Sequence, residues 1–218
     1  MKIELENVLP HDIERRSFEL IEQELPHPLD STLAPIIKRV IHTTADFDYV
    51  DTLYFSEDAL TSAFLALKGG ASIITDTNMA LAGINKPALA KLNCSAYCFM
   101  ADEDVAVAAG LHGSTRASAA MDKASSLTGP LIFAVGNAPT ALVRLYEHIV
   151  QGSLQPALVI GVPVGFVNVI QAKELILQTS VPCIVAKGRK GGSNVAAAIV
   201  NALLYQLTRS EPVGSPSL

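Results

Sequence analysis

Short apolar runs alternate with helical patterns along most of the chain. Five runs rich in Val and Ile end in Gly, Pro or polar residues, as buried strands do, at residues 72–76, 95–100, 131–137, 157–163 and 182–188. Helical patterns lie between most of them, at residues 58–68, 102–109, 114–126, 139–150, 168–178 and 193–208. Apolar strands separated by helices predict an α/β fold, with a mainly parallel five-stranded sheet covered by helices on both faces.

Length and composition favour one domain. The chain has 218 residues, of which 50% are hydrophobic, and we predict a single domain over residues 1–209 and a frayed polar tail at 210–218. The N-terminus is charged and the longest apolar run is broken by Gly and Pro, so we expect a soluble protein without a signal peptide or membrane span. Three cysteines, Cys94, Cys98 and Cys183, are too few for a disulfide framework and favour a reducing cytoplasm. Cys94 and Cys98 are four residues apart in a predicted strand and so share one face, which favours packing over chemistry.

The charge balance and the missing motifs narrow the function. A net charge of -5 with 16 Lys and Arg argues against nucleic acid as the main partner, but allows an acidic small molecule if the cations gather locally. The chain has no GxGxxG, GxxxxGK[ST] or GxSxG sequence. Nucleotide binding by those loops and a serine nucleophile elbow are therefore unsupported.

Three loops follow predicted strands at the edge where α/β sheets bind ligands. They are "VGNAPTAL", which contains Asn137, "GVPVGFV", and "KGRKGGSN", which contains Gly191 and Gly192. In the last loop, backbone N–H groups at the two glycines can face an anion while Arg189 and Lys190 supply positive charge. The alternative is that these glycines only permit tight turns. For one loop alone both interpretations stand, and three such loops on one edge favour a ligand site.

His42 lies on the polar face of a predicted helix that opens near Ser31. The opposite face carries an apolar stripe made of Leu33, Ile36, Ile37, Val40, Ile41 and Thr44. Lys38 and Arg39 share the side of His42, which argues against a core histidine. Two interpretations remain open: a solvated helix face, or a basic surface that binds a polyanion.

Ser17 interrupts the apolar stripe of the preceding helical segment, where Ile13, Leu20 and Ile21 are its neighbours. A hydroxyl in such a place needs a hydrogen-bond partner. That partner is either the backbone carbonyl one turn earlier or a substrate.

Seven segments, taken in order from about residue 13 to residue 204, resemble the precorrin-8X methylmutase family of corrinoid biosynthesis. They are "IERRSFELIEQEL", "RVIHTTADFDY", "TDTNMALAGI", "GSTRASAAM", "VGNAPTAL", "GVPVGFVNV" and "KGRKGGSNVAAAIVNAL". Within the family, "HTTADFDY" and "ADEDVA" look closer to the branch that acts on cobalt-precorrin-8 than to the metal-free branch.

The resemblance implies an isomerase of cobalamin biosynthesis that moves a methyl group from ring carbon 11 to ring carbon 12, giving cobyrinate or hydrogenobyrinate. It implies that His42 exchanges a proton with the macrocycle, which suits an imidazole near neutral pH. It also implies substrate contacts at Ser17 and Arg39, and a further partner for peripheral carboxylates at Arg116.

Further expectations follow from this resemblance. The fold would be a three-layer αβα arrangement of the flavodoxin-like class, and the protein a homodimer with its sites near the subunit interface. No cofactor and no protein-bound metal are expected, because any cobalt arrives inside the substrate. Neither nucleic acid nor a membrane is expected as a partner.

Two other functions remain open at this stage. One is a corrinoid-binding or carrier protein without catalysis, in which His42 only orients the ligand. The other is a phosphate or nucleotide binder that uses "GRKGGS".

Overall fold

The computed structural model describes residues 5–209, so the predicted tail at 210–218 lies outside the described residues. Eleven helices lie in that range: α1 (Ile13–Glu24), α2 (Ala34–Thr44), α3 (Tyr49–Thr52), α4 (Ala59–Lys68), α5 (Asn78–Gly83), α6 (Lys86–Lys91), α7 (Glu103–His112), α8 (Arg116–Ser125), α9 (Pro139–Val150), α10 (Val169–Leu177) and α11 (Ser193–Thr208). The strands in the same range are β1 (Leu53–Phe55), β2 (Ser72–Thr75), β3 (Ser95–Tyr97), β4 (Leu131–Val135), β5 (Leu158–Gly161) and β6 (Cys183–Ala186).

The strands form one mixed sheet in the order β1-β6-β5-β4-β2-β3. The five predicted strands are present and pair in parallel, whereas β1 pairs antiparallel with β6. The prediction of five strands was therefore wrong by one. The "LYF" of β1 is only three residues long and follows α3 directly, so it has no apolar run of its own to signal a strand.

The β3 strand is shorter than predicted, which changes the interpretation of two cysteines. It covers Ser95–Tyr97, so Cys94 precedes the strand and Cys98 follows it, and they do not share one strand face. Cys94 is buried and Cys98 half-buried, and both thiols are free. Packing remains the better account of Cys94, whose thiol donates to the Leu67 carbonyl at 3.2 Å.

The six helices predicted between strands are confirmed, and three short ones, α3, α5 and α6, were missed. Each is six residues or shorter, too short for a helical repeat of apolar positions. Local caps hold two of them in place. The Thr77 side chain accepts from the N–H of Ala80, and the Asn85 side chain accepts from the N–H of Ala88.

Helices cover both faces of the sheet, and each face has its own hydrophobic cluster. Side chains of α2, α4, α5, α6 and α11 pack on one face, and side chains of α7, α8, α9 and α10 pack on the other. Successive residues of β4 alternate between the clusters, with Ile132 in the first and Phe133 in the second. The described part of the chain contains no helix long and apolar enough to cross a membrane.

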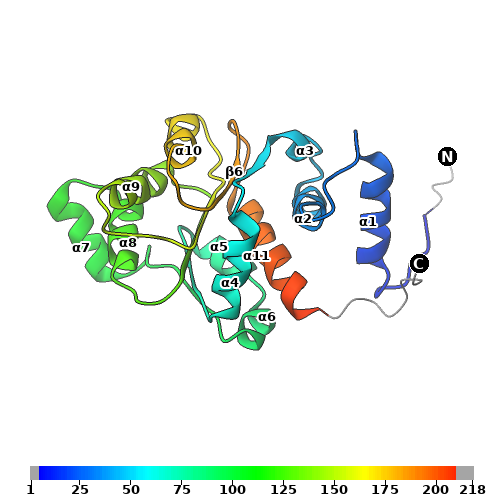
Figure 1. Ribbon diagram of the computed structural model, residues 1–218, viewed down its shortest axis with the longest axis horizontal. Coiled ribbons are helices and arrows are strands. Elements are labelled where there is room, and N and C mark those ends of the chain that lie inside the picture. Colours follow the sequence, from blue (N-terminus) through cyan, green and yellow to red (C-terminus); the bar gives the residue numbers. More distant parts are fainter. Residues whose placement is uncertain (1–4, 210–218) are drawn as a thin grey trace.

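The first helix is the most peripheral element of the first face. Figure 1 shows α1 at one end of the molecule, beside α2, and α7, α8 and α9 at the other end. Ile21 is the one residue of α1 that is buried. Charged and aromatic side chains hold the rest of the helix against α2 and α11. The surface that they form, which includes Glu14, Phe18, Arg39 and His42, is called the groove below.

Candidate active site

The α2 helix presents its two faces as the periodicity predicts. Ile36, Ile37, Val40 and Ile41 are buried against the core, and His42 is exposed on the other side. The helix begins at Ala34, three residues later than predicted, with Pro35 in its first turn. Within residues 5–209, the ring nitrogens of His42 have no hydrogen-bond partner. Both nitrogens are therefore open to a ligand.

The Phe18 side chain of α1 lies against both site residues of α2. Its ring is stacked on the His42 imidazole, with centroids 5.4 Å apart and planes 8° from parallel. The Arg39 guanidinium lies 4.6 Å from the Phe18 centroid and 5.2 Å from the Tyr205 centroid of α11. Arg39 therefore lies near two aromatic rings, which is a favourable place for a cation.

Carboxylates of α1 pair with the cations of α2. Glu14 binds Arg39 and also accepts from Arg209 at 2.9 Å, and Glu22 accepts from Lys38 at 2.6 Å. Burial raises the pKa of the Glu14 carboxyl, but hydrogen bonds from Arg209 and Arg39 outweigh burial and hold the pKa below its ordinary value. Glu14 is therefore ionised at neutral pH and competes for Arg39 with any other anion.

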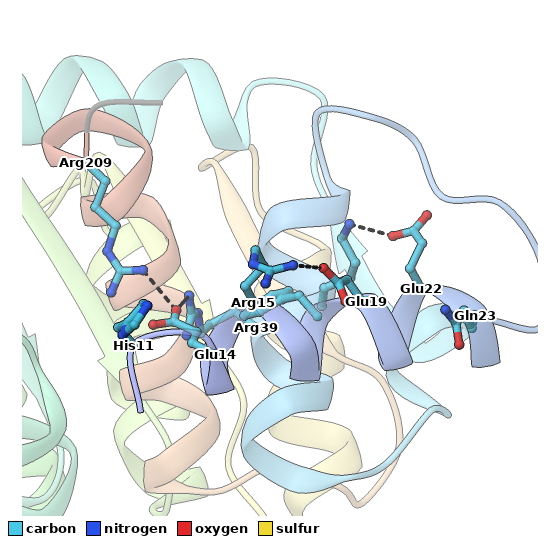
Figure 2. Close-up of a pocket in the computed structure, with 10 residues that line it drawn as sticks. His11, Glu14, Arg15, Glu19, Glu22, Gln23, Arg39 and Arg209 are labelled. Carbon is cyan, nitrogen blue, oxygen red and sulfur yellow. Dashed lines mark hydrogen bonds and ion pairs between the residues drawn. The ribbon is translucent and has the colours of Figure 1, made fainter. Parts of the chain in front are cut away.

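A pocket of about 780 Å³ lies along this side of α1. Figure 2 shows its charged lining, with the Glu14 carboxylate pointing at the guanidinium groups of Arg39 and Arg209. Five basic or imidazole side chains line it: His11, Arg15, Lys38, Arg39 and Arg209. The volume lies in the range of small-molecule sites. His42 and Ser17 lie outside this lining, although Phe18, which contacts His42, belongs to it.

The Ser17 hydroxyl donates to the Ile13 carbonyl at 2.8 Å. Of the two partners that the sequence left open, the structure therefore supplies the backbone carbonyl one turn earlier. A contact between Ser17 and substrate stays a prediction, which would require the hydroxyl to give up or share this bond.

Asn137 lies in the loop after β4, which a buried carboxylate holds in shape. Asp76 is fully buried and accepts from the N–H groups of Gly136, Asn137 and Ala138 at 2.8, 2.8 and 2.6 Å. Burial raises the pKa of Asp76, and the three N–H donors oppose that shift. The Asn137 residue itself is exposed at this edge. The loop therefore has the fixed backbone that a binding loop needs.

Gly191 and Gly192 have a structural reason to be glycine. A Cβ on Gly191 would lie 2.1 Å from the Val162 carbonyl oxygen, and φ is +155° at Gly191 and +137° at Gly192. The N–H of Gly192 donates to the Val162 carbonyl at 2.9 Å, so it is not free for an anion. Close approach to the loop after β5 thus explains Gly191, and the positive φ together with the nearby Asn194 side chain explains Gly192; anion binding there stays a prediction.

Lys190, the expected cation of this loop, is paired within the chain. Its ammonium lies 2.6 Å from Asp46 and 2.5 Å from Asp48. These carboxylates raise the pKa of Lys190. They follow directly on α2, so the pair joins the helix of His42 to the loop after β6.

A buried cation under the same loop was missed in the sequence. Lys173 of α10 is 2% exposed, and its ammonium donates to the carbonyls of Gly188 and Lys190, both at 2.8 Å. Burial lowers the pKa of Lys173 to about 8. Nothing in "AKELIL" separates this lysine from the solvated lysines of other helices, since its partners are backbone carbonyls of a distant loop.

Arg116 opens α8 and is exposed. The preceding Thr115 caps the helix and hydrogen-bonds Thr140 at 2.9 Å, which places Arg116 beside the loop of Asn137. Helix α8 packs in the cluster on the opposite face of the sheet from α2. The fold therefore joins the start of α8 to the start of α9, just after the loop of Asn137, and keeps α8 on the other face of the sheet from the helix of His42.

Known proteins resemble this chain over nearly its whole length. A family model described as precorrin-8X methylmutase matches residues 12–206. The chain therefore belongs to the precorrin-8X methylmutase family. It is a methylmutase, that is, an isomerase of cobalamin biosynthesis, as the seven segments predicted.

Individual relatives support this membership. The cobalt-precorrin-8 methylmutase of Salmonella typhimurium is 48% identical over 91% of this chain and 96% of that protein, and that of Leptospira interrogans is 43% identical over 90% and 93%. The precorrin-8X methylmutase of Pseudomonas aeruginosa is 37% identical over 88% and 93%. A crystal structure of precorrin-8X methylmutase from Thermus thermophilus superimposes with a TM-score of 0.80 at 40% identity, over 88% of this chain and 96% of that one.

Proposed function

We propose that this methylmutase acts on cobalt-precorrin-8, moving the methyl group from ring carbon 11 to ring carbon 12 to give cobalt-containing cobyrinate. The support is the names of the relatives above: those at 48% and 43% identity are cobalt-precorrin-8 methylmutases, whereas the precorrin-8X methylmutases of Thermus thermophilus and Pseudomonas aeruginosa stand at 40% and 37%. The cobalt would be part of the substrate and would need no protein ligand.

The observation that carries the proposal is the position of His42. Its imidazole is exposed on the cationic face of α2 with both nitrogens open, and Arg39 lies one turn earlier on the same helix. An imidazole there can donate a proton to the macrocycle as the methyl group migrates and take it back afterwards. Protonation of a ring nitrogen draws electron density from the neighbouring carbon and so favours migration.

The substrate carries acetate and propionate arms, and we assign Lys38, Arg39 and Arg209 around the pocket to some of them. Each is already paired with a carboxylate of α1, so the arms would exchange with Glu14 and Glu22 instead of meeting free cations. Ser17 is a further predicted contact.

The residues at the carboxyl edge enter the site if two copies meet. Arg116, Asn137, Gly191 and Gly192 lie at that edge, and one chain keeps Arg116 on the far side of the sheet from His42. We propose a homodimer in which the edge of one copy faces α2 of the other. Exposed apolar side chains at this edge, Val164, Phe166 and Val167, support such a contact.

Two finer assignments complete the proposal. Counted among themselves, the five parallel strands run 2-1-3-4-5, the order of the flavodoxin-like class, to which we assign the sheet apart from β1. The three free thiols support a reducing compartment, and we place the enzyme in the cytoplasm.

The test of the activity is optical. Purified protein is mixed with cobalt-precorrin-8, and in a parallel cuvette with metal-free precorrin-8X, and the visible spectrum is followed with time. Because migration changes the conjugation of the ring, we expect a complete spectral change with the cobalt substrate and slower conversion of the metal-free one. A carrier would shift the spectrum once, on binding, and would release unchanged substrate after denaturation. That outcome would contradict the proposal.

A further inference from the structure

Phe18 contacts both α2 residues to which the proposed function gives a chemical role. Its phenyl ring is stacked on the imidazole of His42, 5.4 Å between centroids, and lies beneath the guanidinium of Arg39 at 4.6 Å. His42 and Arg39 are three residues apart on α2, so they lie on adjacent turns of one face. One side chain of α1 therefore supports both at once.

The orientation of His42 depends on this stacking. An imidazole that exchanges protons is usually fixed by a hydrogen bond to one of its nitrogens. The described part of the chain offers no such bond to His42, and rotation about the bond to an aromatic ring is intrinsically broad. A parallel phenyl ring restricts this rotation through the face of the imidazole. Both nitrogens lie in the ring plane and stay accessible.

Aromatic contacts and an ion pair also restrict the guanidinium of Arg39. The rings of Phe18 and Tyr205 lie within 4.6 and 5.2 Å of its guanidinium carbon, while Glu14 takes part of its hydrogen-bonding edge. A guanidinium with its plane fixed loses less freedom when it binds a carboxylate with two parallel N–H groups. The ring of Phe18 thus contacts both the Arg39 guanidinium and the His42 imidazole, and restricts the movement of both.

We propose that Phe18 is a positioning residue of the methyl migration, because its ring aligns the His42 imidazole for proton exchange. This inference rests on the proposed role of His42. It predicts that removing the aromatic face lowers the rate of the chemical step more than it weakens substrate binding.

The test compares three variants of the full chain. Phe18→Leu keeps an apolar side chain but removes the flat ring, and Phe18→Tyr keeps the ring. Phe64→Leu makes the same change at another half-buried phenylalanine, in α4, and serves as the control for general loss of packing. An aromatic pair contributes enough to change a rate about three- to tenfold, so we expect Phe18→Leu to lower kcat by about that factor with KM within about twofold. Phe18→Tyr and Phe64→Leu should stay within about twofold of wild type in kcat.

A spectroscopic readout separates alignment from stability. The chain has five histidines, so its imidazole proton signals are few, and His42→Gln assigns the one of interest. Stacking shields protons above the Phe18 ring, so the His42 signals should move downfield in Phe18→Leu and stay in place in Phe64→Leu.

Three results would overturn the inference: unchanged His42 signals in Phe18→Leu, unchanged kcat in Phe18→Leu, or an equal loss of kcat in Phe64→Leu. If kcat is unchanged and KM rises, Phe18 is only a binding contact. The proposed role of His42 is tested separately. Full activity of His42→Gln would contradict that role, whatever the activity of Phe18→Leu.

Discussion

The groove between α1 and α2 and the carboxyl edge of the sheet are built from different kinds of interaction. In the groove, side chains on the surface meet one another, as Glu14 meets Arg39 and Phe18 meets His42. At the edge, buried charges hold backbone, as Asp76 holds the loop after β4 and Lys173 holds the loop after β6.

The groove and the carboxyl edge should therefore differ in how far they can rearrange around a ligand. Exposed ion pairs contribute little to stability, so the carboxylates of α1 can give way to substrate carboxylates at small cost. Buried charges are costly to leave without partners, and close glycine contacts leave no room for movement. We therefore expect the edge to be rigid and the α1 side of the groove to rearrange.

The greatest loss of stability is expected from a substitution at Gly191. In Gly191→Ala the new Cβ would lie 2.1 Å from the Val162 carbonyl oxygen at a φ of +155°, and we expect about 3 kcal/mol of lost stability in denaturant unfolding. The matched control is Gly110→Ala in α7, where no atom lies within 4 Å of the new Cβ. That change should stabilise the protein by about 0.5–1 kcal/mol. Equal effects of the two substitutions would show that the edge is not tightly packed.

A smaller effect is the pH dependence that Lys173 gives to the free energy of unfolding. Its pKa falls from 10.5 in the unfolded chain to about 8 in the fold, so between those values the unfolded chain binds the extra proton and stability rises with pH. The cost of burying the charge is fully present below pH 8 and is relieved as pH rises through 8. From pH 7.5 to 9.5 this group should add about 2 kcal/mol to the free energy of unfolding.

Lys173→Met removes this pH dependence of stability. Wild type and variant are unfolded in urea at both pH values, and the difference between their free energies of unfolding is compared, because other groups cancel in that difference. Whatever its sign at pH 7.5, the free energy of unfolding of the variant minus that of wild type should fall by about 2 kcal/mol by pH 9.5. A difference independent of pH would mean that Lys173 keeps an ordinary pKa and is solvated.

The smallest effect is a change in ligand affinity, expected from a substitution in the groove. Glu14→Gln removes the carboxylate that competes for Arg39, so the affinity for cobyrinate, measured by its visible absorbance, should rise about threefold. Glu24→Gln makes the same charge change at the exposed end of α1 and should leave the affinity unchanged. A weaker affinity in Glu14→Gln would indicate that Glu14 orients Arg39 instead of competing for it.

Local patterns allowed prediction of much of the fold and part of the site. The spacing of Ile36, Ile37, Val40 and Ile41 was enough to place His42 on the exposed face of α2, because burial of a helix follows its own repeat. The same reasoning found the parallel strands but not β1, whose three residues carry no repeat.

Contacts between distant segments could not be predicted in this way. Glu14 and Arg39 are 25 residues apart, and Asp76 is 60 residues from Gly136, so no spacing in the chain relates them. Gly191 was noticed, but its nearest neighbour, Val162, depends on the packing of two loops. The sequence therefore indicated which residues matter more readily than what each one contacts.

His42 is proposed to exchange a proton with the macrocycle during the methyl migration, and single-turnover kinetics test that role. Excess enzyme is mixed with cobalt-precorrin-8, and conversion is followed for wild type, His42→Gln and the control His27→Gln, which changes an exposed histidine paired with Asp51. Loss of a proton-exchanging group should slow conversion at least about 100-fold in His42→Gln, with cobyrinate affinity within about threefold. His27→Gln should convert at the wild-type rate. Conversion by His42→Gln within about threefold of wild type would contradict the account.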